Sequence, residues 1–133
     1  MDVAAVVVGI VADGNRFMVE RRRQDEDIDP NIVCLPAGHV KSGENLEDAL
    51  KREMMEELGI LVKEAKFVCS NFYGASNGER QNAYGYLITE YDGLPVCKTA
   101  QEIFWEDNIQ NLSLEVERKT ISKMKEIYTQ KST

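Results

Sequence analysis

Residues 38–60 read GHVKSGENLEDALKREMMEELGI, and this stretch predicts a loop followed by one helix. We expect the helix to begin near Glu44 and to end at Gly59, because the residues between them include no Pro or Gly and many strong helix formers. Ser42 is the candidate N-cap, and Gly59 suits the left-handed conformation that commonly follows a helix. The rest of the chain is interpreted around this loop and helix.

Three acidic residues of the expected helix lie on one side of it, next to its apolar stripe. Glu53, Glu56 and Glu57 occupy positions i, i+3 and i+4, so their carboxylates are neighbours on the helix surface. The apolar stripe beside them consists of Leu46, Leu50, Met54 and Leu58. Partly buried carboxylates that repel one another need compensation, and a divalent cation that prefers oxygen ligands, Mg²⁺ or Mn²⁺, would supply it.

The helix alone leaves a second interpretation open. Acid-rich helices with neighbouring basic residues are common on protein surfaces, where their charges are solvated or paired. In either interpretation Arg52 is expected to relieve one acid at most. The loop that precedes the helix distinguishes the two interpretations.

The loop and the helix together resemble the signature of the Nudix hydrolases at every defined position. The matching positions are Gly38, five residues, Glu44, seven residues, Arg52-Glu53, two residues of which the first is apolar, Glu56-Glu57, one residue, Gly59 and the apolar Ile60. Residues 35–40 (LPAGHV) also resemble the MutT-like branch of the family, in which Gly is commoner than Ala37. This number of restricted positions makes the resemblance specific.

The resemblance implies a metal site built from side-chain and backbone oxygens. The implied ligands are Glu53, Glu56, Glu57 and the backbone carbonyl of Gly38. Arg52 and Glu44 are expected to hold these ligands in orientation. The expected cofactor is Mg²⁺, which Mn²⁺ can replace.

Acids of the same site are expected to take part in catalysis. Glu53 is the first candidate for the base that accepts the proton of the attacking water. Members of the family commonly carry an acid near the metal site on the strand after the central hairpin, so the resemblance implies Glu102 as the second candidate or as a late metal ligand. A plain surface acid is the open alternative for Glu102. Glu56 is expected to be essential as well. His39 is the lone histidine and lacks partners for a zinc site, so its role is left open.

Side chains outside this stretch are candidates for binding the substrate. Arg21 ends the second expected strand, where MutT-like relatives often carry a basic residue, and its fork could grip a phosphate or belong to a solvated charged loop. Phe72, Tyr73 and Tyr84 lie on the expected central hairpin, where they could stack on a nucleobase, although packing is the commoner role. In MutT-like relatives a polar residue near the start of the last helix contacts the nucleobase, so the resemblance implies Glu115 or Glu117 in this role.

The resemblance implies hydrolysis of a nucleoside triphosphate to the monophosphate and pyrophosphate, with oxidised nucleotides of the 8-oxo-dGTP type as one candidate substrate. The alternative enzyme is an ADP-ribose or nucleotide-sugar pyrophosphatase. A further alternative is a nucleotide-binding module of the same fold without turnover. Such modules usually lack one of the box acids, and all of them are present here.

Alternating apolar residues and turn signals predict strands along the rest of the chain. We expect a buried first strand up to a hairpin turn at 13–15 and a final helix over 113–128, capped by Ser113. The other strands are expected over residues 16–21, 32–35, 60–75, 81–91 and 102–105. The order predicts an α/β fold, the α/β/α sandwich with a central mixed sheet that the resemblance implies, in one domain over residues 1–133.

Composition limits the class of partner. The 133 residues include 16 basic and 23 acidic residues, for a net charge of −7, which argues against binding a long nucleic acid but allows a small nucleotide with a metal ion. The three scattered cysteines predict free thiols and a cytoplasmic location. The N-terminal apolar run is short and lacks a basic flank, so we expect no signal peptide and no membrane segment. The sequence does not decide the oligomeric state, which is either a monomer or a homodimer.

Overall fold

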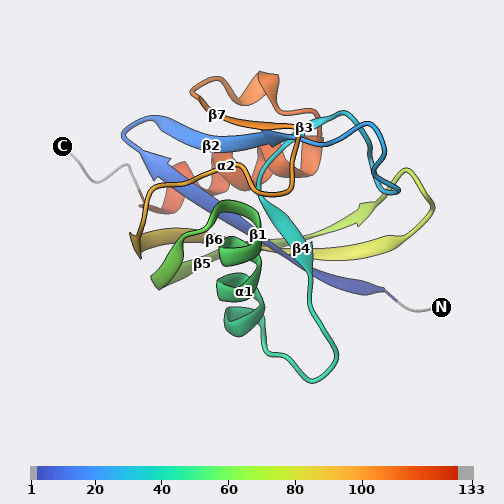
Figure 1. The fold of residues 1–133 in the computed structure, drawn as a ribbon, viewed down its shortest axis with the longest axis horizontal. Helices are drawn as coiled ribbons and strands as arrows, with labels where there is room; N and C mark the ends of the chain where they lie inside the picture. Colours follow the sequence, from blue (N-terminus) through green and yellow to red (C-terminus); the bar gives the residue numbers. More distant parts are fainter. Residues whose placement is uncertain (1–2, 129–133) are drawn as a thin grey trace.

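The computed structural model describes residues 3–128 (Figure 1). Its elements are β1 (Ala4–Asp13), β2 (Arg16–Arg21), β3 (Val33–Cys34), β4 (Ala37–His39), α1 (Leu46–Leu58), β5 (Leu61–Gly74), β6 (Arg80–Asp92), β7 (Glu102–Glu106), the 3₁₀ turn η1 (Ile109–Asn111) and α2 (Glu115–Tyr128). The expected strands and both expected helices are present, with bounds that shift by a few residues. The three residues of β4 form a strand where the sequence predicted the beginning of a loop.

β1 is the central strand of a mixed sheet. It pairs in parallel with β6 and antiparallel with β4 and β2, and the strand order along the main path is β3-β2-β1-β6-β5. Its side chains alternate between two cores: Val7 and Val11 pack in the cluster under α1, and Val8 and Ile10 pack in the cluster under α2. The helices therefore cover opposite faces of the sheet, which confirms the expected α/β/α sandwich (Figure 1).

α1 is capped at both ends by residues that suit those positions. Its N-cap is Asn45, whose side-chain oxygen accepts a hydrogen bond of 2.8 Å from the backbone N–H of Asp48. The prediction of Ser42 was wrong, because Asn45 is an equally good cap and stands directly before the first helical residue. At the other end Gly59 has φ 71° and donates its N–H to the carbonyl of Met55, as expected.

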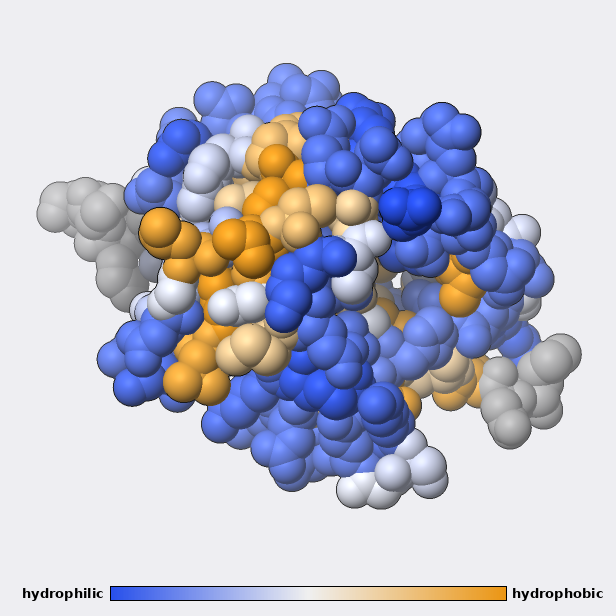
Figure 2. All heavy atoms as spheres, viewed as in Figure 1, coloured by the Kyte–Doolittle hydropathy of each residue, from blue (hydrophilic) through white to orange (hydrophobic). Residues whose placement is uncertain are grey.

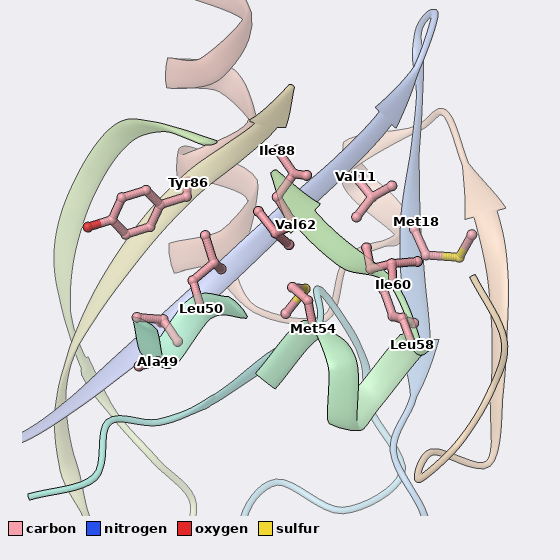
Figure 3. Packing of buried hydrophobic residues seen from close by; sticks show 11 residues of the cluster. Val11, Met18, Ala49, Leu50, Met54, Leu58, Ile60, Val62, Tyr86 and Ile88 are labelled. Atoms are coloured by element: carbon pink, nitrogen blue, oxygen red, sulfur yellow. The ribbon is translucent and has the colours of Figure 1, made fainter. Parts of the chain in front are cut away.

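The apolar stripe of α1 packs against the sheet (Figure 3). Leu50, Met54 and Leu58 are buried, and each such side chain contributes about 1.5–3 kcal/mol to stability. Gly9 of β1 allows the close approach, because a β-carbon there would lie 2.7 Å from the sulfur of Met54. This packing fixes the rotation of α1, and with it the position of Glu53 next to Met54.

The final helix begins two residues later than expected. Ser113 does not cap it: its hydroxyl accepts a hydrogen bond of 2.9 Å from the N–H of Val33, and its own N–H donates to the carbonyl of Val33. These two bonds fasten the start of α2 to β3. They place the first turns of α2 beside the strand that leads into the Nudix-like stretch.

Two further expectations concern the cysteines and the helices. Cys34, Cys69 and Cys97 are free, as the sequence predicted. No helix within residues 3–128 is long and apolar enough to cross a membrane. In the view of Figure 2, exposed apolar atoms gather around the segment that connects β6 with β7, where Leu94 and Val96 are exposed.

Candidate active site

A cavity of about 410 Å³ brings together α1, β1, β2, the loop after β2, and the first turns of α2. Its charged walls come mainly from α1 and β2 and include Arg52, Glu53, Glu56, Glu57 and Glu20. Its apolar walls come from β1, the β2–β3 loop and α2 and include Val6, Val8, Ile28, Ile32, Leu114 and Val116. One space therefore joins a group of acids to an apolar compartment.

Arg52 organises the acids of α1. Its Nε and Nη2 atoms donate to the carboxylate of Glu44 at 2.8 and 2.9 Å, and Nη2 also donates to the carbonyl of His39 at 2.9 Å. Its Nη1 atom donates to Glu53 at 2.8 Å and to Glu56 at 3.3 Å. The prediction that this arginine relieves one acid at most was wrong, because the planar fork of five N–H donors reaches three carboxylates at once. These hydrogen bonds lower the pKa of Glu44 to about 2.

Glu53 lies against the backbone at Gly38. A β-carbon on residue 38 would overlap the Glu53 carboxylate, so the position accepts only glycine as long as Glu53 stays in place. Glu53 is 8% exposed, and this burial raises its pKa despite the hydrogen bond from Arg52. The loop glycine and the helix acid, 15 positions apart in the signature, are thus in direct contact.

Glu20, on β2, is a residue of the cavity that the sequence did not single out. It is 3% exposed, its carboxyl lies within hydrogen-bonding range of Glu57, and its Oε2 atom has no hydrogen-bond partner. Burial and the negative charge of Glu57 raise the pKa of Glu20 to about 9. An acid two positions after the apolar Met18, on the same face of a buried strand, was the signal available in the sequence.

The structure does not bring Arg21 or Glu102 into the cavity. They are register partners on β2 and β7, and Arg21 Nε donates to Glu102 at 3.0 Å on an exposed surface. The pleat of β2 explains this, because successive side chains of a strand point to opposite faces and Glu20 takes the inward direction. Arg22, just after the strand, lines the cavity instead and donates to the carbonyl of Ile28 at 3.0 Å.

Of the three aromatic residues expected to bind a base, Phe72, Tyr73 and Tyr84, the cavity includes Tyr73. Phe72 is 59% exposed, and Tyr84 is half-buried against the core under α1. The aromatic side chain that does line the cavity is Tyr73, whose hydroxyl donates to Asp29 at 2.7 Å. Asp29 also accepts the N–H of Ser76, so the loop after β2 is fastened to the β5–β6 hairpin. Neighbouring residues of one strand face opposite ways, which the sequence pattern did not resolve.

Of the two acids at the start of α2, Glu117 lines the cavity. Its Oε1 atom accepts a hydrogen bond of 2.9 Å from the backbone N–H of Leu35, and burial raises its pKa to about 8. Glu115 is exposed and pairs loosely with Lys119 at 3.9 Å. The apolar compartment thus contains a carboxyl group that a fixed backbone N–H orients.

His39 also lines the cavity. Its Nε2 atom lies 2.8 Å from the carboxylate of Glu79, which accepts a further hydrogen bond of 2.8 Å from the side chain of Gln81. The carbonyl of His39 accepts from Arg52, so β4 is tied to both the hairpin and α1. These bonds hold β4, the strand that contains Gly38, in position beside α1.

The chemistry of the donors suits a divalent cation. The box acids and Glu20 offer carboxyl oxygens, which hard ions prefer as ligands, and the backbone at Gly38 lies against the Glu53 carboxylate. In the arrangement that the structure describes for residues 3–128, no three acidic, histidine or cysteine side chains converge to the spacing of a metal site. Glu53 and Glu56 are instead paired with the guanidinium of Arg52.

Comparison with known proteins agrees with the geometry. The family model of the NUDIX domain matches residues 1–108. The chain belongs to the Nudix family. Its Nudix box is residues 38–60, and the enzyme is a Nudix pyrophosphohydrolase.

Relatives of this Nudix enzyme include two bacterial proteins named 8-oxo-dGTP diphosphatase. The one from Haemophilus influenzae is 31% identical over 101 residues, which cover 75% of this chain and 73% of that protein. The one from Buchnera aphidicola subsp. Schizaphis graminum is 29% identical over 101 residues, which cover 75% of this chain and 74% of that protein. A MutT Nudix hydrolase from Burkholderia pseudomallei has the same fold, with a TM-score of 0.80, 22% identity, and coverage of 92% of this chain and 98% of that one.

Proposed function

We propose that this Nudix enzyme hydrolyses a nucleoside triphosphate to the monophosphate and pyrophosphate with Mg²⁺ as its cofactor, and that oxidised nucleotides of the 8-oxo-dGTP type are its first candidate substrates. One observation carries the proposal: the cavity that contains the box acids continues into an apolar compartment with one oriented carboxyl, Glu117. A polyphosphate next to the acids would place its base in that compartment. The names of the relatives support the same substrate class.

The box supplies the ligands that a cation would need. Glu53, Glu56 and Glu57, with the backbone carbonyl of Gly38, are the groups that would hold it. A bound divalent cation neutralises the phosphates and lowers the pKa of a water molecule. Glu56 is the most adaptable of these ligands, because its side chain is half exposed and its bond to Arg52 is the longest of that arginine's bonds at 3.3 Å.

Glu53 is the residue that we assign as the general base. Its pKa is raised by burial, which makes the carboxylate a better proton acceptor than a solvated one. The hydrogen bond from Arg52 and the backbone at Gly38 fix its orientation. Arg22, on the wall of the same cavity, is the arginine that we assign to the phosphates in place of Arg21.

Glu117 is the residue that we assign to recognition of the nucleobase. The N–H of Leu35 fixes one carboxyl oxygen, which leaves the other to contact an edge of the base. A pKa of about 8 keeps the carboxyl largely protonated at neutral pH, so it can donate a hydrogen bond to a carbonyl or ring nitrogen. Apolar side chains around it exclude the water that would compete for that bond.

A panel of nucleotides assayed with Mg²⁺ tests the proposal. Release of pyrophosphate from a nucleoside triphosphate, with the oxidised purine nucleotides hydrolysed at the highest kcat/KM, is the expected result. Preferential cleavage of ADP-ribose or a nucleotide sugar would replace the proposed substrate class. Nucleotide binding without turnover on any member of the panel would instead leave a binding module.

A further inference from the structure

Glu20 is an acid in the cavity that lies outside the Nudix box and has no role in the proposed function. It is 3% exposed and follows Met18 on the face of β2 that packs under α1. Its carboxyl lines the cavity within hydrogen-bonding range of Glu57, the last acid of the box. A strand far from α1 in the sequence thus delivers a carboxyl group to the acids of that helix.

The two arginines of the site are engaged elsewhere. Arg52 pairs with three other acids, and Arg22 pairs with Glu26 and the carbonyl of Ile28. In the part of the chain that the structure describes, no salt bridge includes Glu20 or Glu57. These two facing carboxyl groups therefore lack the direct cationic partner that the other box acids have.

The Oε2 atom of Glu20 is an independent sign of a missing ligand. It is buried, and it is the single buried side-chain oxygen or nitrogen within residues 3–128 that has no hydrogen-bond partner. Buried polar atoms are paired in most native structures, because leaving one unpaired is costly. An unpaired carboxyl oxygen beside a second carboxyl group can serve as a ligand of a hard divalent cation, which displaces the proton when it binds.

We propose that Glu20 is a ligand of the divalent cation in this enzyme, opposite Glu57, so that the site is completed from β2 as well as from α1. The inference rests on the proposed function, which locates the cation at the box acids. The alternation of side chains along the strands supports this proposal. Arg21 and its partner Glu102 lie on one face of β2 and β7, whereas Glu20 lies on the opposite face, which is the face that packs under α1 and its box acids.

Binding of Mn²⁺ alone, measured by the electron paramagnetic resonance signal of the free ion, tests the proposal without any nucleotide. We expect Glu20→Gln to weaken Mn²⁺ binding by about tenfold or more. We expect its unfolding temperature without metal to stay level or rise, because the amide is neutral and similar in size to the protonated carboxyl that it replaces. Glu90→Gln, at an exposed strand glutamate that does not line the cavity, is the matched control and should change neither quantity.

Glu20→Asp provides a second variant that keeps the charge and withdraws the carboxyl by one methylene. A ligand role predicts weaker Mn²⁺ binding here too. Glu57→Gln completes a double-mutant cycle: if both acids bind one ion, the double variant loses less affinity than the product of the two single losses. Additive losses would indicate that the two acids act separately and would overturn the shared site.

Failure of this proposal is distinguishable from failure of the proposed function. Wild-type Mn²⁺ affinity in both Glu20 variants, together with weakened binding in Glu57→Gln, would overturn the role of Glu20 and leave the hydrolase standing. Absence of Mn²⁺ binding and of nucleotide hydrolysis in the unmodified protein would overturn both. A fall in unfolding temperature of the metal-free Glu20→Gln protein, with unchanged Mn²⁺ affinity, would make Glu20 a structural residue.

Discussion

The carboxylate of Glu53 occupies the space that a β-carbon on Gly38 would need. This contact joins the loop half of the Nudix box to its helix half. It explains why the box begins with glycine, because the backbone at this position requires room and not a left-handed conformation. Any side chain at position 38 must displace the acid that we assign as the general base.

Gly38→Ala should therefore reduce kcat by at least about tenfold, because even a small displacement of a catalytic group is costly. Overpacking is expected to lower the free energy of unfolding by about 1–3 kcal/mol. Steady-state kinetics and urea unfolding measure the two effects. Gly74→Ala is the matched control: a β-carbon there meets nothing within 4 Å, so activity and stability should stay near those of the wild type.

Arg52→Lys tests the guanidinium fork that binds Glu44, Glu53 and Glu56. A lysine carries the same charge but cannot reproduce the parallel bonds, so we expect a loss of about 1–3 kcal/mol in unfolding free energy and a lower kcat. Arg23→Lys alters an exposed pair with Asp25 and should change stability by less than about 0.5 kcal/mol. Equal effects of the two substitutions would mean that the fork does not organise the site.

The sequence predicted the parts of the site that local spacing determines. The three acids of α1 lie on one side of the helix because positions i, i+3 and i+4 always do, and Gly59 ends the helix because its left-handed backbone favours glycine. The β1–β2 and β5–β6 hairpins were also predicted from turn signals between neighbouring strands. These features depend on bonds between residues close in the chain, so one sequence is enough to recognise them.

Contacts between residues far apart in the chain could not be predicted from local sequence patterns. The cavity receives Glu20 and Arg22 where the sequence predicted Arg21, because a shift of one residue reverses the face of a strand. Likewise, the choice of Glu117 over Glu115 depends on how α2 is rotated against β3, which the bonds between Ser113 and Val33 determine. Long-range packing decides these positions, and no local pattern encodes it.

Glu56→Gln tests the assignment of the cation site. Mg²⁺ at millimolar concentration should raise the unfolding temperature of the wild type, because an ion that binds the folded state stabilises it by mass action. The variant should lose most of that shift and its turnover, while its unfolding temperature without metal stays the same, since the side chain is half exposed. Differential scanning fluorimetry with and without EDTA measures the shift. Glu47→Gln, an exposed acid on the same helix, should keep both, and wild-type turnover in Glu56→Gln would contradict the assignment.

Glu117 makes stability depend on pH in a definite direction. Burial raises its pKa from 4.5 to about 8, so the folded protein holds a proton that the unfolded chain releases above pH 4.5. The stabilising contribution is therefore complete below about pH 4.5 and is lost as the pH rises through about 8. Glu20, whose pKa is also raised, contributes with the same sign, so the effect of Glu117 must be isolated by substitution.

Glu117→Gln should flatten this part of the pH dependence. A neutral amide takes no part in the proton equilibrium, so the variant should lose less unfolding free energy between pH 5 and pH 8 than the wild type, by on the order of a few kcal/mol. Urea unfolding at the two pH values measures the difference. Glu115→Gln, on the same helix but exposed, should keep the wild-type dependence. Identical pH dependence in the wild type and Glu117→Gln would mean that the Glu117 carboxyl is ionised in the folded protein, and the proposed hydrogen bond from its proton to the base would fail with it.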